Sequence, residues 1–417
     1  MNLYDENGCP KPISDFQKAS EEDMRWWREA RFGMFVHWGP ASLGGSDISW
    51  CRDSGYRPGD HNMFAEPKIS AAIYDNFYKR FDPVNFDAGK WVRLAKDAGM
   101  GYIVLTAKHH DGFCLFDTKF TEYKTTAQDC PCQKDIVKEL ADACHENGLK
   151  LGLYYSARDW YHADYLKGDN SAYLQYYTAQ IAELLTNYGR VDMLWFDHIG
   201  GPHRLWNPDM ILRLARTLQP GILINDRLHA GVHEGRIPEY TCDFDTPEQQ
   251  VGKFNDSRPW ESCMCLVGGV WSYKPNGEMM TFENCVRTLA SCAGGDGNLL
   301  LNTGPMPNGN IEERQMERLL EIGEWLGKYG ESIYDTRGGP IMPTQDCACT
   351  HRGDTLYLHI FDKAKTYKLA GLKGNMESCI ALNGSAEAEL RNGELYVSRI
   401  CGGECDTIIK IKMDRPQ

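Results

Sequence analysis

The sequence predicts an α/β protein: a (β/α)8-like TIM barrel followed by a small C-terminal antiparallel β-sandwich domain. From about residue 30 to 330, short β-branched or aromatic runs alternate with longer amphipathic segments, which is typical of a parallel sheet wrapped by helices. After residue 333 the pattern changes to short alternating runs separated by Gly, Asn and Asp turns, which predicts antiparallel strands. We therefore place the barrel at residues 1–335 and the sandwich at 336–417.

Strand-like runs account for the expected size of the barrel. Six are clear and two are less regular, and about eight strands over about 300 residues fit one barrel better than two smaller domains. The clear runs are 32–38, 102–110, 150–156, 191–197, 221–226 and 298–304, and the less regular ones are 241–245 and 265–271. Helical patterns at 86–99, 134–148, 173–189 and 312–330 lie between them, each ending at a glycine suited to a helix C-cap.

Composition and charge narrow the class of protein. In 417 residues, 42% are hydrophobic and 25% charged, which excludes a disordered or fibrous chain. The net charge of −13 makes nucleic acid and anionic membranes poor partners. No stretch approaches the roughly 18 apolar residues of a membrane span, and residues 1–16 lack the pattern of a secretion signal. We expect a cytoplasmic protein, unless a leader was removed.

Cysteine is abundant for that compartment, with 16 residues. The closely spaced cysteines are Cys130/Cys132, Cys263/Cys265, Cys347/Cys349 and Cys401/Cys405, and none has the C-x-x-C spacing of a zinc knuckle. A chain of this length needs no disulfides in order to fold. We therefore expect free thiols in a reducing cytosol.

Polar residues at the ends of the apolar strands are the candidates for a functional site, because a TIM barrel builds its site at the C-terminal ends of its strands. Asp197 is the sharpest of them. It ends the run VDMLWF, where a charged residue would be costly to bury, and it shares a face with Trp195. An aromatic plane beside a carboxylate suits a sugar ring that becomes cationic in its transition state. The alternative is that Asp197 is a helix N-cap.

The histidines at strand ends leave two interpretations open. His109 and His110 point to opposite sides of an extended strand, so both serve one site only if the chain turns there. With His37 and His198 they could form a metal site, although no H-x-H or H-E-x-x-H pairing is present. Hydrogen bonds to substrate hydroxyls are the interpretation we favour.

Glycoside cleavage with retention needs a second carboxylic acid about 5–5.5 Å from the first. The candidates after Asp197 are Glu234, Glu239, Glu248 and Glu261. Glu248 lies in a proline-containing loop, where a mobile carboxyl can reach a leaving oxygen. Glu261 opens a predicted strand and could equally be a structural partner for Arg227 or Arg258.

Five motifs in order resemble the α-L-fucosidases of glycoside hydrolase family 29. They are FGMFVHWGPASL, TAKHHDGFCLFDTKFTEY, LGLYYSARDW, LWFD and GNLLLNTGPMPNGNI, and the resemblance runs from about Trp26 to Tyr334. It implies a retaining exo-enzyme with a (β/α)8-like catalytic domain and a C-terminal β-sandwich. By resemblance Asp197 is the nucleophile and Glu248 the acid/base. The sugar-binding positions it implies are His37, Trp50, His109, His110, Tyr154, Trp195, Arg227 and Trp271, the last packing on the fucose methyl group.

The chain departs from many of these relatives at Ser49, where they carry a glutamate before the tryptophan. Serine cannot supply a carboxylate there, whereas Trp50 can keep its role. We therefore predict a retaining exo-α-L-fucosidase that acts on fucosylated oligosaccharides or glycoconjugates and needs no metal or organic cofactor. Two rivals are a fucose-binding protein that has lost turnover and a metal hydrolase that uses the histidines. Linkage preference and oligomeric state are not predicted.

Overall fold

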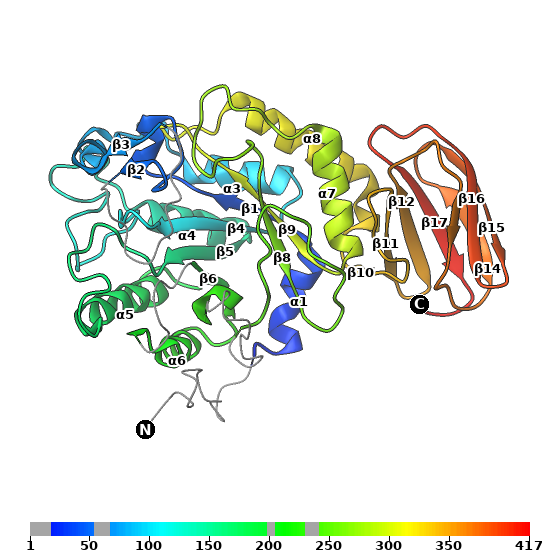
Figure 1. The fold of residues 1–417 in the computed structure, drawn as a ribbon, viewed down its shortest axis with the longest axis horizontal. Coiled ribbons are helices and arrows are strands. Elements are labelled where there is room, and N and C mark those ends of the chain that lie inside the picture. Colours follow the sequence, from blue (N-terminus) through cyan, green and yellow to red (C-terminus); the bar gives the residue numbers. More distant parts are fainter. Residues whose placement is uncertain (1–17, 54–66, 198–204, 230–241) are drawn as a thin grey trace.

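The computed structural model describes residues 18–53, 67–197, 205–229 and 242–417. Figure 1 shows a parallel barrel-like sheet surrounded by helices, with a separate antiparallel unit beyond α7 and α8. Seven parallel strands lie in the order β7-β6-β5-β4-β1-β9-β8. Their bounds are Phe32–Val36 (β1), Tyr102–Lys108 (β4), Lys150–Ser156 (β5), Met193–Asp197 (β6), Leu223–Ile224 (β7), Glu261–Cys265 (β8) and Asn298–Thr303 (β9). The predicted fold class is confirmed.

Residues 243–249, which we call the closing segment, lie between β7 and β8 and complete the ring. The segment pairs with each neighbour through isolated parallel bridges rather than a continuous ladder. On one side the amide of Asp243 donates to the carbonyl of Ile224 over 2.8 Å. On the other, the amide of Cys263 donates to the carbonyl of Pro247 over 3.1 Å. The closing segment therefore acts as the eighth strand of the barrel.

Of the two less regular strands that the sequence predicts, one is partly present in the structure and the other is absent. The run at 241–245 lies partly outside the described residues, and its later part belongs to the closing segment. The prediction of a strand at 265–271 was wrong, because the strand in this part of the chain is β8, which ends at Cys265. The chain turns away soon afterwards at Gly269, whose positive φ of 72° does not fit a strand. The predicted strand at 221–226 shortens to β7.

The inside of the barrel is filled by apolar side chains, one or two from each strand. They include Phe35, Tyr154, Trp195, Phe244 and Leu300, which belong to one buried cluster. Helix α1 (Glu21–Ala30) adds Met24 and Trp27 to this cluster. The inside is therefore a packed core, and an opening is left at the ends of the strands where the polar residues lie.

Helices surround the sheet and bury a second, larger core against its outer face. They are α3 (Ala88–Asp97), α4 (Ile136–Asn147), α5 (Ser171–Thr186), α6 (Pro208–Leu218), α7 (Phe282–Gly294) and α8 (Glu313–Tyr329). The short helix α2 (Ala71–Tyr74) packs in a separate small cluster instead. Asp87, Asp135 and Thr281 cap the N-termini of α3, α4 and α7. Gly148 takes the left-handed conformation expected of a C-cap after α4. In the described part of the chain, no helix combines the length and apolar character that crossing a bilayer requires.

The C-terminal unit consists of two antiparallel sheets packed face to face. One has the order β10-β11-β12-β17-β14 and the other β13-β16-β15. Their buried core draws side chains from both sheets, among them Leu358, Ile409, Leu395 and Val397. The bounds are Arg337–Gly338 (β10), Cys347–Arg352 (β11), Thr355–Ile360 (β12), Tyr367–Leu369 (β13), Met376–Ala381 (β14), Ser385–Arg391 (β15), Glu394–Cys401 (β16) and Thr407–Met413 (β17).

A buried ion-pair network joins the two units. Asp296, just before β9, accepts from Arg31 over 2.6 Å and from the Nε of Arg337 on β10 over 3.0 Å. Arg287 on α7 also donates to the backbone carbonyls of Cys405 and Phe361. Because Arg31 and Asp296 are almost fully buried, removing either partner would leave an unpaired charge in the joint.

Candidate active site

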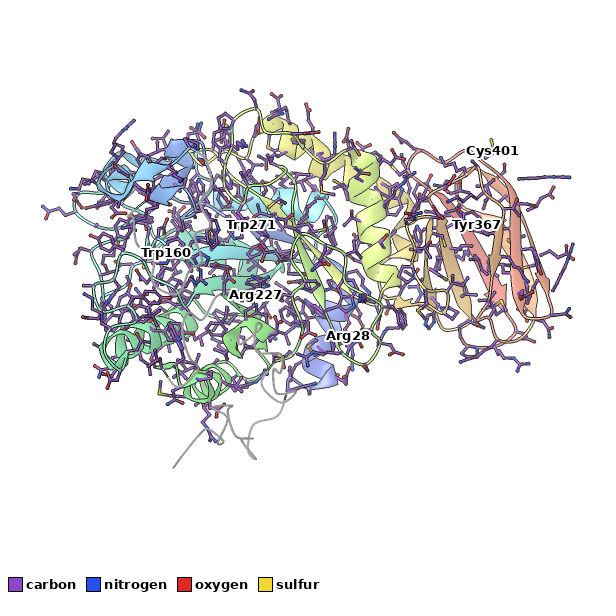
Figure 2. The ribbon with its side chains drawn as sticks, in the orientation of Figure 1. Arg28, Trp160, Arg227, Trp271, Tyr367 and Cys401 are labelled. Atoms are coloured by element: carbon purple, nitrogen blue, oxygen red, sulfur yellow. The ribbon has the colours of Figure 1, made fainter. Side chains whose placement is uncertain are left out.

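A single pocket at the C-terminal end of the barrel brings together all ten site residues predicted from the sequence. Figure 2 shows Arg227 and Trp271 in the middle of the barrel unit, and both belong to this pocket. Phe35 and Cys263 line it as well and were not predicted. The full lining is Phe35, His37, Trp50, His109, His110, Tyr154, Trp195, Asp197, Arg227, Glu248, Cys263 and Trp271.

Asp197 is the last residue of β6, and its carboxylate is held by two donors. The Tyr154 hydroxyl donates to Oδ2 over 2.7 Å, and Nη1 of Arg227 donates to Oδ1 over 2.8 Å. The carboxylate is 9% exposed, so these bonds lie in a largely desolvated setting. They fix its orientation, and the arginine balances its charge. The next described α-helix, α6, begins at Pro208 and is capped by Asn207, so Asp197 is not its N-cap.

Arg227 joins the two carboxylates of the pocket. Its Nη2 lies 2.9 Å from Oε2 of Glu248, whereas Nη1 contacts Asp197. Thr246 holds the guanidinium from the side, and the ring of Trp195 lies 4.7 Å beneath it. Burial opposes the charge of Arg227, but Asp197 raises its pKa above the ordinary value. The arginine is therefore a fixed cation between the two acids.

The two acids differ in exposure. The side chain of Glu248 is 39% exposed and lies on the closing segment, whereas that of Asp197 is 9% exposed and lies on a regular strand. A carboxylate that is fixed and desolvated suits a nucleophile, and one that is exposed at the rim can exchange protons with water. The different settings thus match two different roles.

Glu261 is not part of the pocket, and the expectation that it pairs with Arg227 or Arg258 was wrong. It is fully buried inside the barrel and accepts hydrogen bonds from Trp27, Tyr102 and Trp195. Burial raises its pKa to about 7. Arg258 instead pairs with Asp245. The other two candidates for the acid, Glu234 and Glu239, lie outside the described residues, as does His198.

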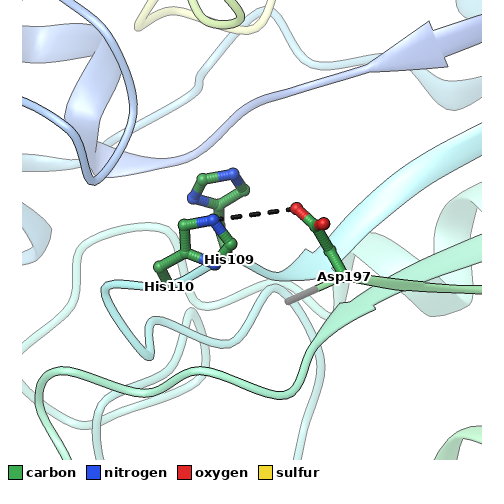
Figure 3. Close-up of side chains that lie close together, drawn as sticks. All are labelled: His109, His110 and Asp197. Carbon is green, nitrogen blue, oxygen red and sulfur yellow. Dashed lines mark ion pairs between the residues drawn. The ribbon is translucent and has the colours of Figure 1, made fainter. Parts of the chain in front are cut away.

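His109 and His110 both face the pocket because β4 ends before them. The strand stops at Lys108, and the two rings lie 4.1 Å apart at their centroids. Figure 3 shows them together beside Asp197, with Nε2 of His110 3.7 Å from the carboxylate. The chain therefore makes the turn that shared use of these histidines required.

Two serine hydroxyls orient this histidine pair from behind. Nδ1 of His109 lies 2.6 Å from Oγ of Ser49, and Nδ1 of His110 lies 2.6 Å from Oγ of Ser156. Ser49 also accepts from the amide of Asp111 over 2.9 Å. Ser49 thus supports a pocket histidine.

His109, His110 and Asp197 are also the residues that could hold a metal ion, since their ligand atoms lie within 4.8 Å of one another. The chemistry of the set fits a metal poorly, because both carboxylate oxygens already accept from Tyr154 and Arg227. A metal would also lie beside the fixed cation of Arg227. Hydroxyl groups of a neutral ligand, which donate and accept hydrogen bonds, suit these side chains better.

Aromatic rings form the walls of the pocket. Trp271 lies 4.8 Å from His37 between ring centroids, and its backbone amide donates to Asp47 over 2.7 Å. On the other side Trp50 contacts His110 edge to face at 5.1 Å. Beneath them Tyr154 and Trp195 are stacked at 5.6 Å. The pocket is thus closed at its base and lined with rings, as a site for one sugar unit would be.

Comparison with known proteins is consistent with this geometry. The family model described as alpha-L-fucosidase matches residues 11–331. The plasma alpha-L-fucosidase of Homo sapiens is 31% identical over 328 residues, which cover 75% of this chain and 69% of that protein. An alpha-L-fucosidase of Branchiostoma floridae is 31% identical over 363 residues, covering 81% of this chain and 78% of that one.

A solved structure extends the likeness beyond the barrel. The alpha-L-fucosidase isoenzyme 1 from Paenibacillus thiaminolyticus superposes with a TM-score of 0.82 at 33% identity, and the match covers 95% of this chain and all of that one. The family model covers about three quarters of the chain, including every pocket residue. The chain therefore belongs to the alpha-L-fucosidase family of glycoside hydrolases.

Proposed function

We propose that this protein is a retaining exo-α-L-fucosidase that removes terminal α-linked L-fucose from oligosaccharides or glycoconjugates by double displacement. The observation that carries the proposal is the bridge made by Arg227, which holds a buried and a partly exposed carboxylate in one pocket. Both acids contact the same guanidinium, and two neighbouring carboxyl groups are what a double displacement requires. The family supplies fucose as the sugar.

In the first step an oxygen of Asp197 attacks the anomeric carbon and the glycosidic C–O bond breaks, while Glu248 gives its proton to the departing oxygen. In the second step water attacks the anomeric carbon, Glu248 takes the water's proton, and the bond to Asp197 breaks. Tyr154 and Arg227 orient the nucleophile throughout. Two inversions return fucose with the α configuration.

The closed base of the pocket supports cleavage at the end of a chain. Phe35, Tyr154 and Trp195 fill the barrel directly below, so a glycan cannot pass through. Trp271 offers an apolar wall to the methyl group of a 6-deoxy sugar, and the histidines offer ring nitrogens to its hydroxyls. The leaving group would extend toward Glu248, the more exposed acid.

NMR of the first product formed from an aryl α-L-fucoside tests the proposal. We expect fucose to appear as the α anomer and to equilibrate afterwards. Early accumulation of β-fucose would exclude the covalent route. Fucose binding without release of product would favour the catalytically weak binding protein instead. Full activity after treatment with a strong chelator is expected, and loss that zinc restores would favour the metal hydrolase.

We also propose a cytoplasmic location. All 15 cysteines of the described residues are free, and 13 of them are buried. Unpaired thiols in such number suit a reducing compartment. Cell fractionation with thiol counting on the native protein tests this: an exported protein with oxidised thiols would contradict it.

A further inference from the structure

Asn302 on β9 lies directly behind the pocket and makes two side-chain hydrogen bonds. Its Nδ2 donates to the backbone carbonyl of Trp271 over 2.6 Å, and its Oδ1 lies 2.7 Å from Nδ1 of His37. Asn302 is 2% exposed and pairs with Phe35 in the β1–β9 register. One buried amide thus contacts two walls of the pocket, and sequence reasoning gave it no role.

These two bonds determine which nitrogen of His37 carries the proton. The carbonyl of Trp271 can only accept, so the amide nitrogen of Asn302 must face it. The amide oxygen then faces His37, and an oxygen acceptor 2.7 Å from Nδ1 requires Nδ1 to carry hydrogen. In a neutral imidazole with Nδ1–H, the other nitrogen, Nε2, has a lone pair and no proton.

The surroundings keep this imidazole neutral. Burial lowers the pKa of His37 to about 4. The hydrogen bond with Asn302 and the charge of Asp197 oppose that lowering of the pKa, whereas Arg227 adds to it. The other rings against His37 belong to Phe35 on β1, His109 just after β4, Tyr154 on β5 and Trp271 in the loop after β8. Glu248 is the remaining charge of the pocket, and Arg227 pairs with it.

We propose that Asn302 is a positioning residue that makes His37 a hydrogen-bond acceptor, so that the pocket requires a hydroxyl donor at one point of the sugar. The inference rests on the proposed function, since it takes the ligand to be a terminal fucosyl unit. A fucoside that lacks that hydroxyl would leave Nε2 unpaired in a desolvated pocket. Sites built around such a bond reject the analogue far more strongly than a lost methylene would be rejected.

Asn302→Asp tests the inference, because it changes the charge with little change of shape. The introduced carboxylate would stabilise the imidazolium of His37, whose two nitrogens are both donors. We expect kcat/KM of the variant to fall at least tenfold at pH 5–6 and to recover as pH rises and His37 loses its proton. In the wild type, His37 should cause no such loss of kcat/KM at pH 5–6, because its pKa is about 4.

Asn298→Asp is the matched control. Asn298 lies on the same strand, is fully buried and donates to the backbone carbonyl of Trp27 over 2.8 Å, as Asn302 does to Trp271. No histidine contact is recorded for it among the described residues. We expect this variant to lose stability but to keep the wild-type pH profile. If kcat/KM of both variants fell at pH 5–6, the effect would come from damage to the strand, and the inference would be overturned.

Substrate analogues and NMR add independent readouts. We expect one of the 2-, 3- and 4-deoxy-α-L-fucosides to have a kcat/KM tens of fold below that of the parent fucoside with the wild type. With Asn302→Asp at pH 5–6, the same analogue should lose much less. Nitrogen NMR of the ligand-free wild type should show His37 as the Nδ1–H tautomer. The opposite tautomer, or an Asn302→Asp profile like the wild type's, would overturn the positioning role. A protein that releases no fucose but shows the Nδ1–H tautomer would contradict only the proposed function.

Discussion

The indole N–H of Trp195 donates to Oε1 of Glu261 over 3.2 Å. The same indole ring lies 4.7 Å beneath the guanidinium of Arg227. Glu261 therefore influences the pocket from below without contacting a ligand, since Trp195 and Arg227 stand between it and the two acids. This places Glu261 in the support of the site rather than in its chemistry.

Leaving-group chemistry should separate Glu248 from Glu261. A nitrophenolate departs readily without a proton, whereas a sugar alkoxide needs one in the transition state. Glu248→Ala should therefore harm hydrolysis of a fucosyl-oligosaccharide far more than glycosylation by an aryl fucoside, and azide should accelerate the slow deglycosylation. Glu261→Ala should lower kcat/KM on both substrates alike. A leaving-group-dependent loss confined to Glu261→Ala would reverse the assignment.

Removal of Asp197, the proposed nucleophile, should abolish turnover but not binding. Asp197→Gly should lose several orders of magnitude in kcat, because this carboxylate acts in the transition state. Azide should restore part of the turnover by occupying the vacated space. Asp197→Asn, which keeps the volume filled, is the control and should not be rescued. Retention of a tenth of wild-type activity by either variant would mean that another group attacks.

The wall formed by Trp271 should favour a 6-deoxy sugar. A methyl group packs well against an indole, whereas a hydroxymethyl group would leave its hydroxyl without a partner. We expect the wild type to prefer the fucoside over the matching galactoside by tens to hundreds of fold in kcat/KM. Trp271→Ala should reduce that ratio, whereas Trp50→Ala should slow both substrates alike. An unchanged ratio in Trp271→Ala would place the methyl group elsewhere.

Glu261 should make stability depend on pH. Burial raises its pKa to about 7 from an ordinary value near 4.5, so the folded state holds the proton more tightly than the unfolded state does. The bound proton therefore adds to the free energy of unfolding. This contribution, on the order of 3 kcal/mol, is complete below about pH 4.5 and is lost as pH rises through 7. Denaturant unfolding of wild type and Glu261→Gln across this window measures it. The exposed Glu313→Gln is the control, and parallel curves for wild type and Glu261→Gln would contradict the prediction.

Most of the site could be predicted because it follows from the sheet. His37, Tyr154 and Asp197 lie at or just beyond the ends of regular parallel strands, and those ends meet at one edge of a barrel. Their polar character after apolar runs is visible in the sequence. Phe35 and Cys263, which were missed, also carry a signal. Phe35 lies two residues before His37 and Cys263 two residues after the inward-facing Glu261, so each is expected on the same side of the sheet as that neighbour.

The supporting residues could not be predicted, because their partners are distant in the chain. Asn302 lies 265 residues from His37, and Glu261 lies 234 residues from Trp27. An asparagine or glutamate in an apolar strand shows only that some partner exists, and the fold decides which one. The signal for the eighth strand was only weak in the sequence. The closing segment contains Pro247, which is unusual inside a strand, and it pairs with its neighbours only through isolated bridges.

The closing segment, which carries Glu248, can change independently of the regular strands, which carry Asp197. Glu248 belongs to a segment that pairs with its neighbours only through isolated bridges, whereas Asp197 ends a strand that is paired with β5 along its length. An insertion or deletion in the chain before Asp243 would move Glu248, the proposed acid/base, but would leave the pocket side chains on β5 and β6 in place. Such a barrel can acquire a new leaving-group preference without rebuilding its recognition of the sugar that is released.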